Sequence, residues 1–150
     1  MSWWGVGLDL LTLQVVLGGL CYFAYSYPWV ARLIGLLFLA AAAQTALPLR
    51  ALTPARAFAA ALLGQLPGLL GSINVALEQL PLYRHNSLGD ILDFLMESWH
   101  TVLLPWLRFL PARAVPTRSG EAVMPFFLAL PLLSPLLVGW VLLTATLFRR

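Results

Sequence analysis

The chain has no lysine, a single cysteine and few charged residues of either sign. Charged residues make up 10% of its 150 residues and hydrophobic residues 61%. A soluble domain carries roughly 25% charged and about 45–50% apolar residues. A domain of this size leaves a large share of its surface exposed, so its interior cannot hide this excess of apolar side chains. We therefore expect lipid or partner proteins, rather than water, to cover most of the molecule.

The scarcity of cysteine and the scatter of the basic residues exclude further classes of protein. One cysteine, Cys21, can form neither an internal disulfide nor a cysteine-based metal site, and we interpret it as a packing residue. All nine basic residues are arginine, and they lie in several connections instead of on one face, which argues against a nucleic-acid partner. No motif of a soluble enzyme occurs. The sequence gives no reason to expect an enzyme, a cofactor or a bound metal.

Four apolar runs are long enough to cross a hydrocarbon core of roughly 30 Å as helices. They cover about residues 5–26, 30–49, 57–79 and 122–148. Aromatic residues flank the first run, as in the interfacial belts of membrane proteins. The sequence predicts one all-α domain over residues 1–150, an integral membrane bundle of four or five transmembrane helices plus one amphipathic helix.

The location follows from the same runs, whereas the orientation does not. No basic segment precedes the first run, so we expect it to be retained as a helix instead of being cleaved as a signal peptide. The arginines divide almost equally between the two sides in either topology, which leaves the orientation open. We expect a multi-pass protein of a cell membrane, of the bacterial cytoplasmic type.

Small residues recur at steps of four in the third apolar run. The positions are Ala60, Gly64, Gly68, Ser72 and Ala76. They line one face of a helix, where small side chains let two membrane helices approach closely. We assign this face to helix–helix contact, the alternative being chance in a sequence rich in Gly and Ala. Pro67 should kink the helix.

Residues 87–110 form an amphipathic segment, with Asn86 or Ser87 as the cap of a helix. The charged residues fall on one side at the helical period, and Ile91 and Leu95 are among the apolar residues opposite. Because burying these charges is costly, we favour a helix lying in the interface with its apolar side toward lipid. The alternative is a spanning helix whose polar side faces a cavity.

Two groups of residues in this region are candidate sites. Asp93, Glu97 and His100 are four and three residues apart on one face, so their side chains can meet and relay protons or hold a cation. The alternative is the ordinary polar face of an interfacial helix. Arg108, Arg113 and Arg118 are candidate ligands of phosphate head groups.

Other polar residues interrupt the apolar runs. We expect Gln14, Gln44, Gln65, Asn74 and Glu78 to form hydrogen bonds between helices. Asp9 lies near the start of the first run, where it is expected to meet the positive end of the helix dipole. The alternative for Asp9 is to neutralise an arginine of another helix.

Three functional hypotheses remain. The first is a small membrane protein that acts as a subunit, assembly factor or scaffold, in a homo-oligomer or with other membrane subunits. The second is a transporter or ion-conducting component that uses Asp93, Glu97 and His100. The third is a membrane-embedded enzyme acting on lipid, with the three arginines binding phosphate.

Overall fold

A computed structural model describes residues 2–24, 26–48, 52–78, 80, 84, 86–100, 102–103, 115–116, 122–123 and 125–147. Six helices and one pairing of two-residue strands lie in these ranges. They are α1 (Trp3–Phe23), α2 (Pro28–Ala46), α3 (Pro54–Gly64), α4 (Leu66–Glu78), α5 (Ser87–His100), β1 (Val115–Pro116), β2 (Ala122–Val123) and α7 (Pro125–Leu147). The two strands pair antiparallel, Val115 with Val123 and Pro116 with Ala122. The predicted helical architecture is confirmed for the described part of the chain.

Two of these helices are long and apolar enough to cross a membrane, α1 with 21 residues and α2 with 19. The pair α3 and α4 passes the same test together, although the two are bent by 70° at their junction. The stretch Leu133–Leu147 of α7 is apolar but shorter. The described residues thus contain two or three candidate spans, fewer than the four or five predicted, and their apolar helices indicate a membrane location.

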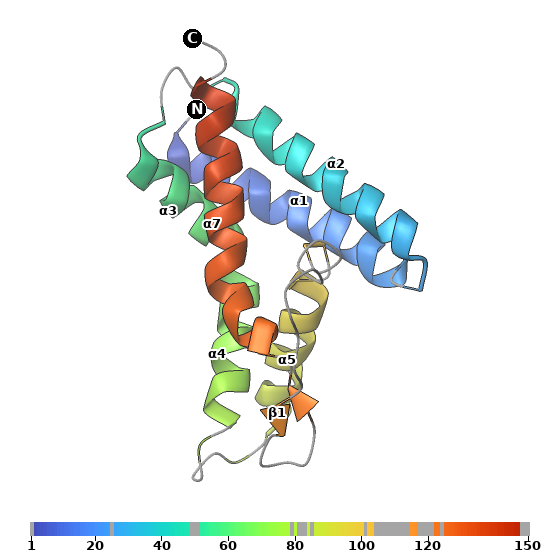
Figure 1. The fold of residues 1–150 in the computed structure, drawn as a ribbon. Coiled ribbons are helices and arrows are strands. Elements are labelled where there is room, and N and C mark those ends of the chain that lie inside the picture. Colours follow the sequence, from blue (N-terminus) through green and yellow to red (C-terminus); the bar gives the residue numbers. More distant parts are fainter. Residues whose placement is uncertain are drawn as a thin grey trace.

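Helices α1 and α2 lie side by side as a hairpin (Figure 1). The Ser2 hydroxyl caps α1 by accepting a bond of 3.4 Å from the Gly5 N–H. Pro28 begins α2 at a position where its missing N–H has no partner to lose. The turn between the helices is rich in exposed aromatic side chains, and the Arg32 guanidinium lies 5.0 Å from the centre of the Trp29 ring.

The predicted third span is two helices because the backbone breaks at Gln65. Pro67 has no N–H with which to continue the α3 hydrogen-bond ladder, and its ring would clash with the carbonyl of Leu63 in a straight helix. The Gln65 N–H instead donates to the carbonyls of Ala61 and Leu62, at 3.0 and 3.2 Å. The kink expected from Pro67 is confirmed as the 70° bend.

The core lies where α3 packs against α1 and α7. Its centre is built from small buried residues, Ala57, Ala60 and Ala61, which let the helices approach closely. A methyl group added at Gly139 of α7 would lie 2.7 Å from Cε1 of Phe58 on α3. Figure 1 shows α7 crossing the α1–α2 hairpin, with α4 and α5 side by side below it.

Helix α5 begins after Asn86, whose side-chain oxygen accepts a bond of 2.9 Å from the Gly89 N–H. It packs along α4, where Met96 lies against Gly71 and Gly89 lies against Asn74, while Ile91 is exposed. Part of the predicted amphipathic helix, residues 104–110, lies outside the described residues.

Candidate functional site

Buried polar side chains from three parts of the chain meet at the break between α3 and α4. Gln14 of α1 and Gln65 at the break are each 1% exposed. The Gln14 carboxamide donates to the carbonyl oxygen of Trp99 in α5, and Gln65 Nε2 donates to Gln14 Oε1 at 3.2 Å. The Trp99 indole N–H donates back to the Gly64 carbonyl at 3.2 Å. We call this set the buried polar crossing; it ties α1 and α5 to the broken helix.

One atom of the buried polar crossing is unsatisfied. Within the described part of the chain, no hydrogen-bond partner reaches Gln65 Oε1, although the atom is buried. Leaving a buried acceptor without a partner costs about 1–3 kcal/mol, so this oxygen is suited to a further donor. The groups of the crossing are neutral amides and an indole, which can hold a hydrogen-bonding ligand but do not carry acid–base chemistry.

Asp93 lies next to a second buried amide, that of Asn74 in α4. Asn74 Nδ2 lies 2.9 Å from Asp93 Oδ1 of α5 and 3.2 Å from Glu78 Oε1 of its own helix. The Asn74 amide therefore binds two carboxylates, Glu78 of α4 and Asp93 of α5. The predicted group of Asp93, Glu97 and His100 did not include Glu78. Its spacing of four residues from Asn74 was the signal in the sequence.

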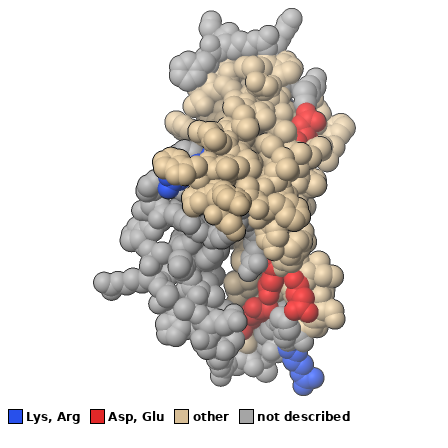
Figure 2. Space-filling model, turned by 90° about the vertical axis from the view of Figure 1, so that its right-hand side faces the viewer, with Lys and Arg blue, Asp and Glu red and all other residues tan. Residues whose placement is uncertain are grey.

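The rest of that predicted group stays a prediction. The side chains of Glu97 and His100 lie outside what the structure describes, as do Arg108, Arg113 and Arg118. Among the described residues, no group of three or more His, Cys, Asp or Glu side chains is arranged to hold a metal ion. Figure 2 shows most of the visible acidic side chains at the lower end of the molecule, where α4 and α5 lie.

The predicted small-residue face is divided by the bend. Ala60 and Gly64 are buried on α3, Gly68 and Ser72 are buried on α4, and Ala76 is exposed. A methyl group added at Gly64 would lie 2.7 Å from Cβ of Leu10, so α3 uses this face against α1 of the same chain. Contact of the face with a second chain stays a prediction.

A further polar feature lies on the outside of the α1–α2 hairpin. A hollow of about 470 Å³ is lined by Asp9, Thr12, Leu13, Ala41, Gln44 and Thr45, and we call it the outer polar groove. The hydroxyls of Thr12 and Thr45 donate to carbonyls of their own helices, at 3.0 and 2.8 Å. Asp9 and Gln44 are exposed, and no hydrogen bond or ion pair to either side chain is present among the described residues.

These positions test the expectations for the isolated polar residues. Helix α1 begins at Trp3 and has no acidic residue in its first turn, so Asp9 lies beyond the reach of the helix dipole and that interpretation is wrong. Hydrogen bonds between helices are confirmed for Gln14, Gln65 and Asn74. Gln44 forms none within the part of the chain that the structure describes.

Comparison of the chain with protein-family models, with curated proteins and with solved structures gives no match.

Proposed function

We propose that the chain is a small multi-pass protein of a cell membrane, of the bacterial cytoplasmic type. In this proposal it acts as a subunit, assembly factor or scaffold by packing its helices against partners. The observation that carries the proposal is the exposure of Asp9 and Gln44 on two helices that are apolar enough to cross a membrane.

Lipid is a poor solvent for this groove, because the groove exposes the polar side chains of Asp9 and Gln44. An aspartate costs about 2.5–3.5 kcal/mol at the centre of a span and less toward its ends, and polar residues in spans normally face a protein interior. Asp9 lies six residues beyond the start of α1, about 9 Å along the helix axis. A partner that covers the groove removes this cost, which supports a role in assembly.

The proposed topology has four crossings. They are α1, α2, the broken pair α3–α4, and α7. Helix α7 has 23 residues and is therefore about 34 Å long, which exceeds a hydrocarbon core of roughly 30 Å. Helix α5, with 14 residues, is too short to cross by itself.

The oligomeric state in lipid tests this proposal. The protein is extracted from its native membrane into lipid nanodiscs formed by a styrene–maleic acid copolymer, and its mass is measured by light scattering. We expect a homo-oligomer or a larger complex, which Asp9→Leu weakens and Val15→Ala, on another exposed side of α1, does not. A homogeneous monomer at every protein concentration would contradict the proposal.

A second candidate, a transporter or ion-conducting component, is favoured by the broken helix. Discontinuous helices surround the substrate sites of many transporters, and here the break carries the unsatisfied Gln65 Oε1. In proteoliposomes, this function requires a pH-dependent flux that Asp93→Asn or Glu97→Gln abolishes. Unchanged flux in both variants, or no flux in the parent, would remove this candidate. A lipid-acting enzyme remains a hypothesis from the sequence alone.

A further inference from the structure

We propose that the partner covering the outer polar groove is a second copy of this chain, related to the first by a two-fold axis along the membrane normal. This inference rests on the proposed function and names the partner. It follows from the position of one unpaired acceptor and one unpaired donor on neighbouring helices of the hairpin.

The symmetry determines which residues meet. A two-fold rotation about the membrane normal keeps every residue at its depth and places α1 of one copy opposite α2 of the other. Asp9 on α1 and Gln44 on α2 line the same hollow and therefore lie at similar depth. Asp9 of each copy consequently faces Gln44 of the other copy, and the two Asp9 carboxylates stay apart. Such an isologous interface repeats every contact twice.

The outer polar groove carries both a hydrogen-bond acceptor and a hydrogen-bond donor, so the grooves of two copies can pair with each other. The Asp9 carboxylate only accepts hydrogen bonds when ionised, whereas the Gln44 carboxamide carries two N–H donors. The hydroxyls of Thr12 and Thr45 donate within their own helices, so Gln44 is the donor left for the other copy. A helix of another protein with a lysine or arginine would pair with Asp9 but would leave the amide of Gln44 unmatched.

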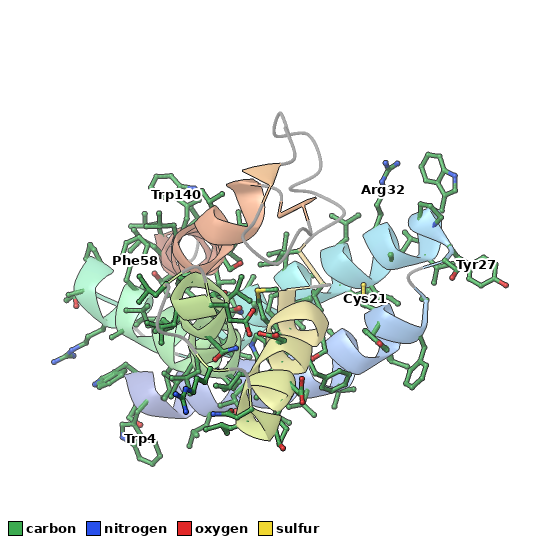
Figure 3. All side chains as sticks on the ribbon, turned by 90° about the horizontal axis from the view of Figure 1, so that it is seen from below. Trp4, Cys21, Tyr27, Arg32, Phe58 and Trp140 are labelled. Atoms are coloured by element: carbon green, nitrogen blue, oxygen red, sulfur yellow. The ribbon has the colours of Figure 1, made fainter. Side chains whose placement is uncertain are left out.

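The chain's own described arginine on this hairpin does not neutralise Asp9. Arg32 lies on α2 close to the turn between the helices, with its guanidinium 5.0 Å from the Trp29 ring centre. Figure 3 shows Arg32 and Tyr27 at one end of the hairpin and Trp4 at the other end. Asp9 is near the Trp4 end, and among the described residues no ion pair to Asp9 is present, which leaves its carboxylate available to a second chain.

The same side of the hairpin continues as an apolar seam. Val16 lies seven residues after Asp9, and Leu37 lies seven residues before Gln44, which is two helical turns along each stripe. Because the helices are antiparallel, both positions are again at one depth, and both side chains are more than half exposed. Two hairpins joined over this seam form a four-helix bundle with a polar contact at one end.

Disulfide cross-linking in native membranes tests the arrangement. Two differently tagged copies are co-expressed in a Cys21→Ser background, one with Val16→Cys and the other with Leu37→Cys. Oxidation should join the two tags in several-fold higher yield than it joins Val16→Cys to itself or Leu37→Cys to itself.

The contribution of the polar contact is measured by energy transfer between labelled copies as the lipid-to-protein ratio is raised. Asp9→Leu and Gln44→Leu should each raise the dimer dissociation constant about tenfold, which corresponds to about 1.4 kcal/mol. Asp9→Asn keeps an acceptor and should retain most of the affinity, and Val15→Ala should leave the constant unchanged.

The outcomes separate this inference from the proposed function. If Val16→Cys and Leu37→Cys formed cross-links only to a different protein, the partner would not be a second copy of this chain, but the proposed role as a subunit would stand. A chain that forms no cross-link and shows no energy transfer would overturn both. A dimer with the same dissociation constant in Asp9→Leu and the parent would also overturn the proposed contact.

Discussion

Gln14 is the residue on which the buried polar crossing depends. It donates to Trp99 and accepts from Gln65, whereas Gln65 makes one side-chain hydrogen bond and keeps an unsatisfied oxygen. Removing the two side chains therefore has different consequences. Loss of the Gln65 side chain removes the unpaired Oε1 of Gln65 but leaves Oε1 of Gln14 unpaired in its place. Loss of the Gln14 side chain leaves both the oxygen and the nitrogen of the Gln65 amide without a partner.

We predict that Gln14→Leu lowers the free energy of unfolding by about 1–2 kcal/mol, because hydrogen bonds between membrane helices average about 0.6 kcal/mol and reach about 1.7. Gln65→Leu should cost less than about 0.5 kcal/mol, since the number of unpaired buried oxygens does not change. Unfolding in mixed micelles of increasing sodium dodecyl sulfate content, followed by circular dichroism, measures both. Equal losses in the two variants would show that the crossing is not organised around Gln14.

At this scale the sequence predicted which buried amides form hydrogen bonds between helices, but not the partners of these amides. A glutamine or asparagine inside an apolar run has to form hydrogen bonds, which identified Gln14, Gln65 and Asn74. The partner of Gln14 is a backbone carbonyl 85 residues away along the chain, and no periodicity connects positions so far apart. Asp9 was misjudged for a related reason, because its role depends on where α1 begins and on which face remains uncovered.

Among the elements, α4 and α5 form a closely packed pair, and the close approach of the two helices requires a glycine at position 71. A methyl group added at Gly71 of α4 would meet the Leu92 carbonyl and would lie 2.7 Å from Cβ of Met96 in α5. Gly19 of α1 offers a matched comparison, because no neighbouring atom lies within 4 Å of an added methyl group there.

We predict that Gly71→Ala destabilises the protein by about 1–3 kcal/mol, the usual cost of overpacking a close contact. Gly19→Ala should be neutral or stabilise by up to about 1 kcal/mol, because alanine favours the helix over glycine. The same micelle titration compares the two variants. A similar effect of both substitutions would mean that α4 and α5 are not in close contact.

The elements also show what hydropathy can and cannot predict. The bounds of the first two spans were predicted to within a few residues. A long apolar run in lipid has to satisfy its own backbone hydrogen bonds, and an uninterrupted helix does so. The third run was equally apolar but contains Pro67, and the sequence could not distinguish a slight kink from a 70° bend. Gly64 and Gln65 at the bend form hydrogen bonds with α5 and α1, and these distant partners are not visible in the run itself.

For the whole molecule, the exposed aromatic residues report how it lies in the membrane. Trp29 is 75% exposed beside Arg32 at the turn of the hairpin, and Trp140 is 61% exposed within the apolar stretch of α7. Aromatic and basic residues together are typical of the interface, whereas the helical turns around Trp140 are mostly apolar and uncharged.

We predict that lipids brominated near the head group quench Trp29 most strongly, and that lipids brominated near the chain ends quench Trp140 most strongly. The fluorescence lost in Trp29→Phe and in Trp140→Phe, relative to the parent, isolates each signal without disturbing Trp99. If a water-soluble quencher such as acrylamide reached both residues equally, the hairpin and α7 would not be embedded in the proposed way.

The contact between Gln14 and Trp99 also has a consequence for how the protein is made. A ribosome delivers the chain from its N-terminus, so α1 enters the bilayer long before residue 99 has been synthesised. Until then the amide of Gln14 has no final acceptor, and α3 and α4, each too short to cross alone, have nothing to hold their bend. The junction therefore stays open until α5 has been synthesised, and α7 is added to the core after that.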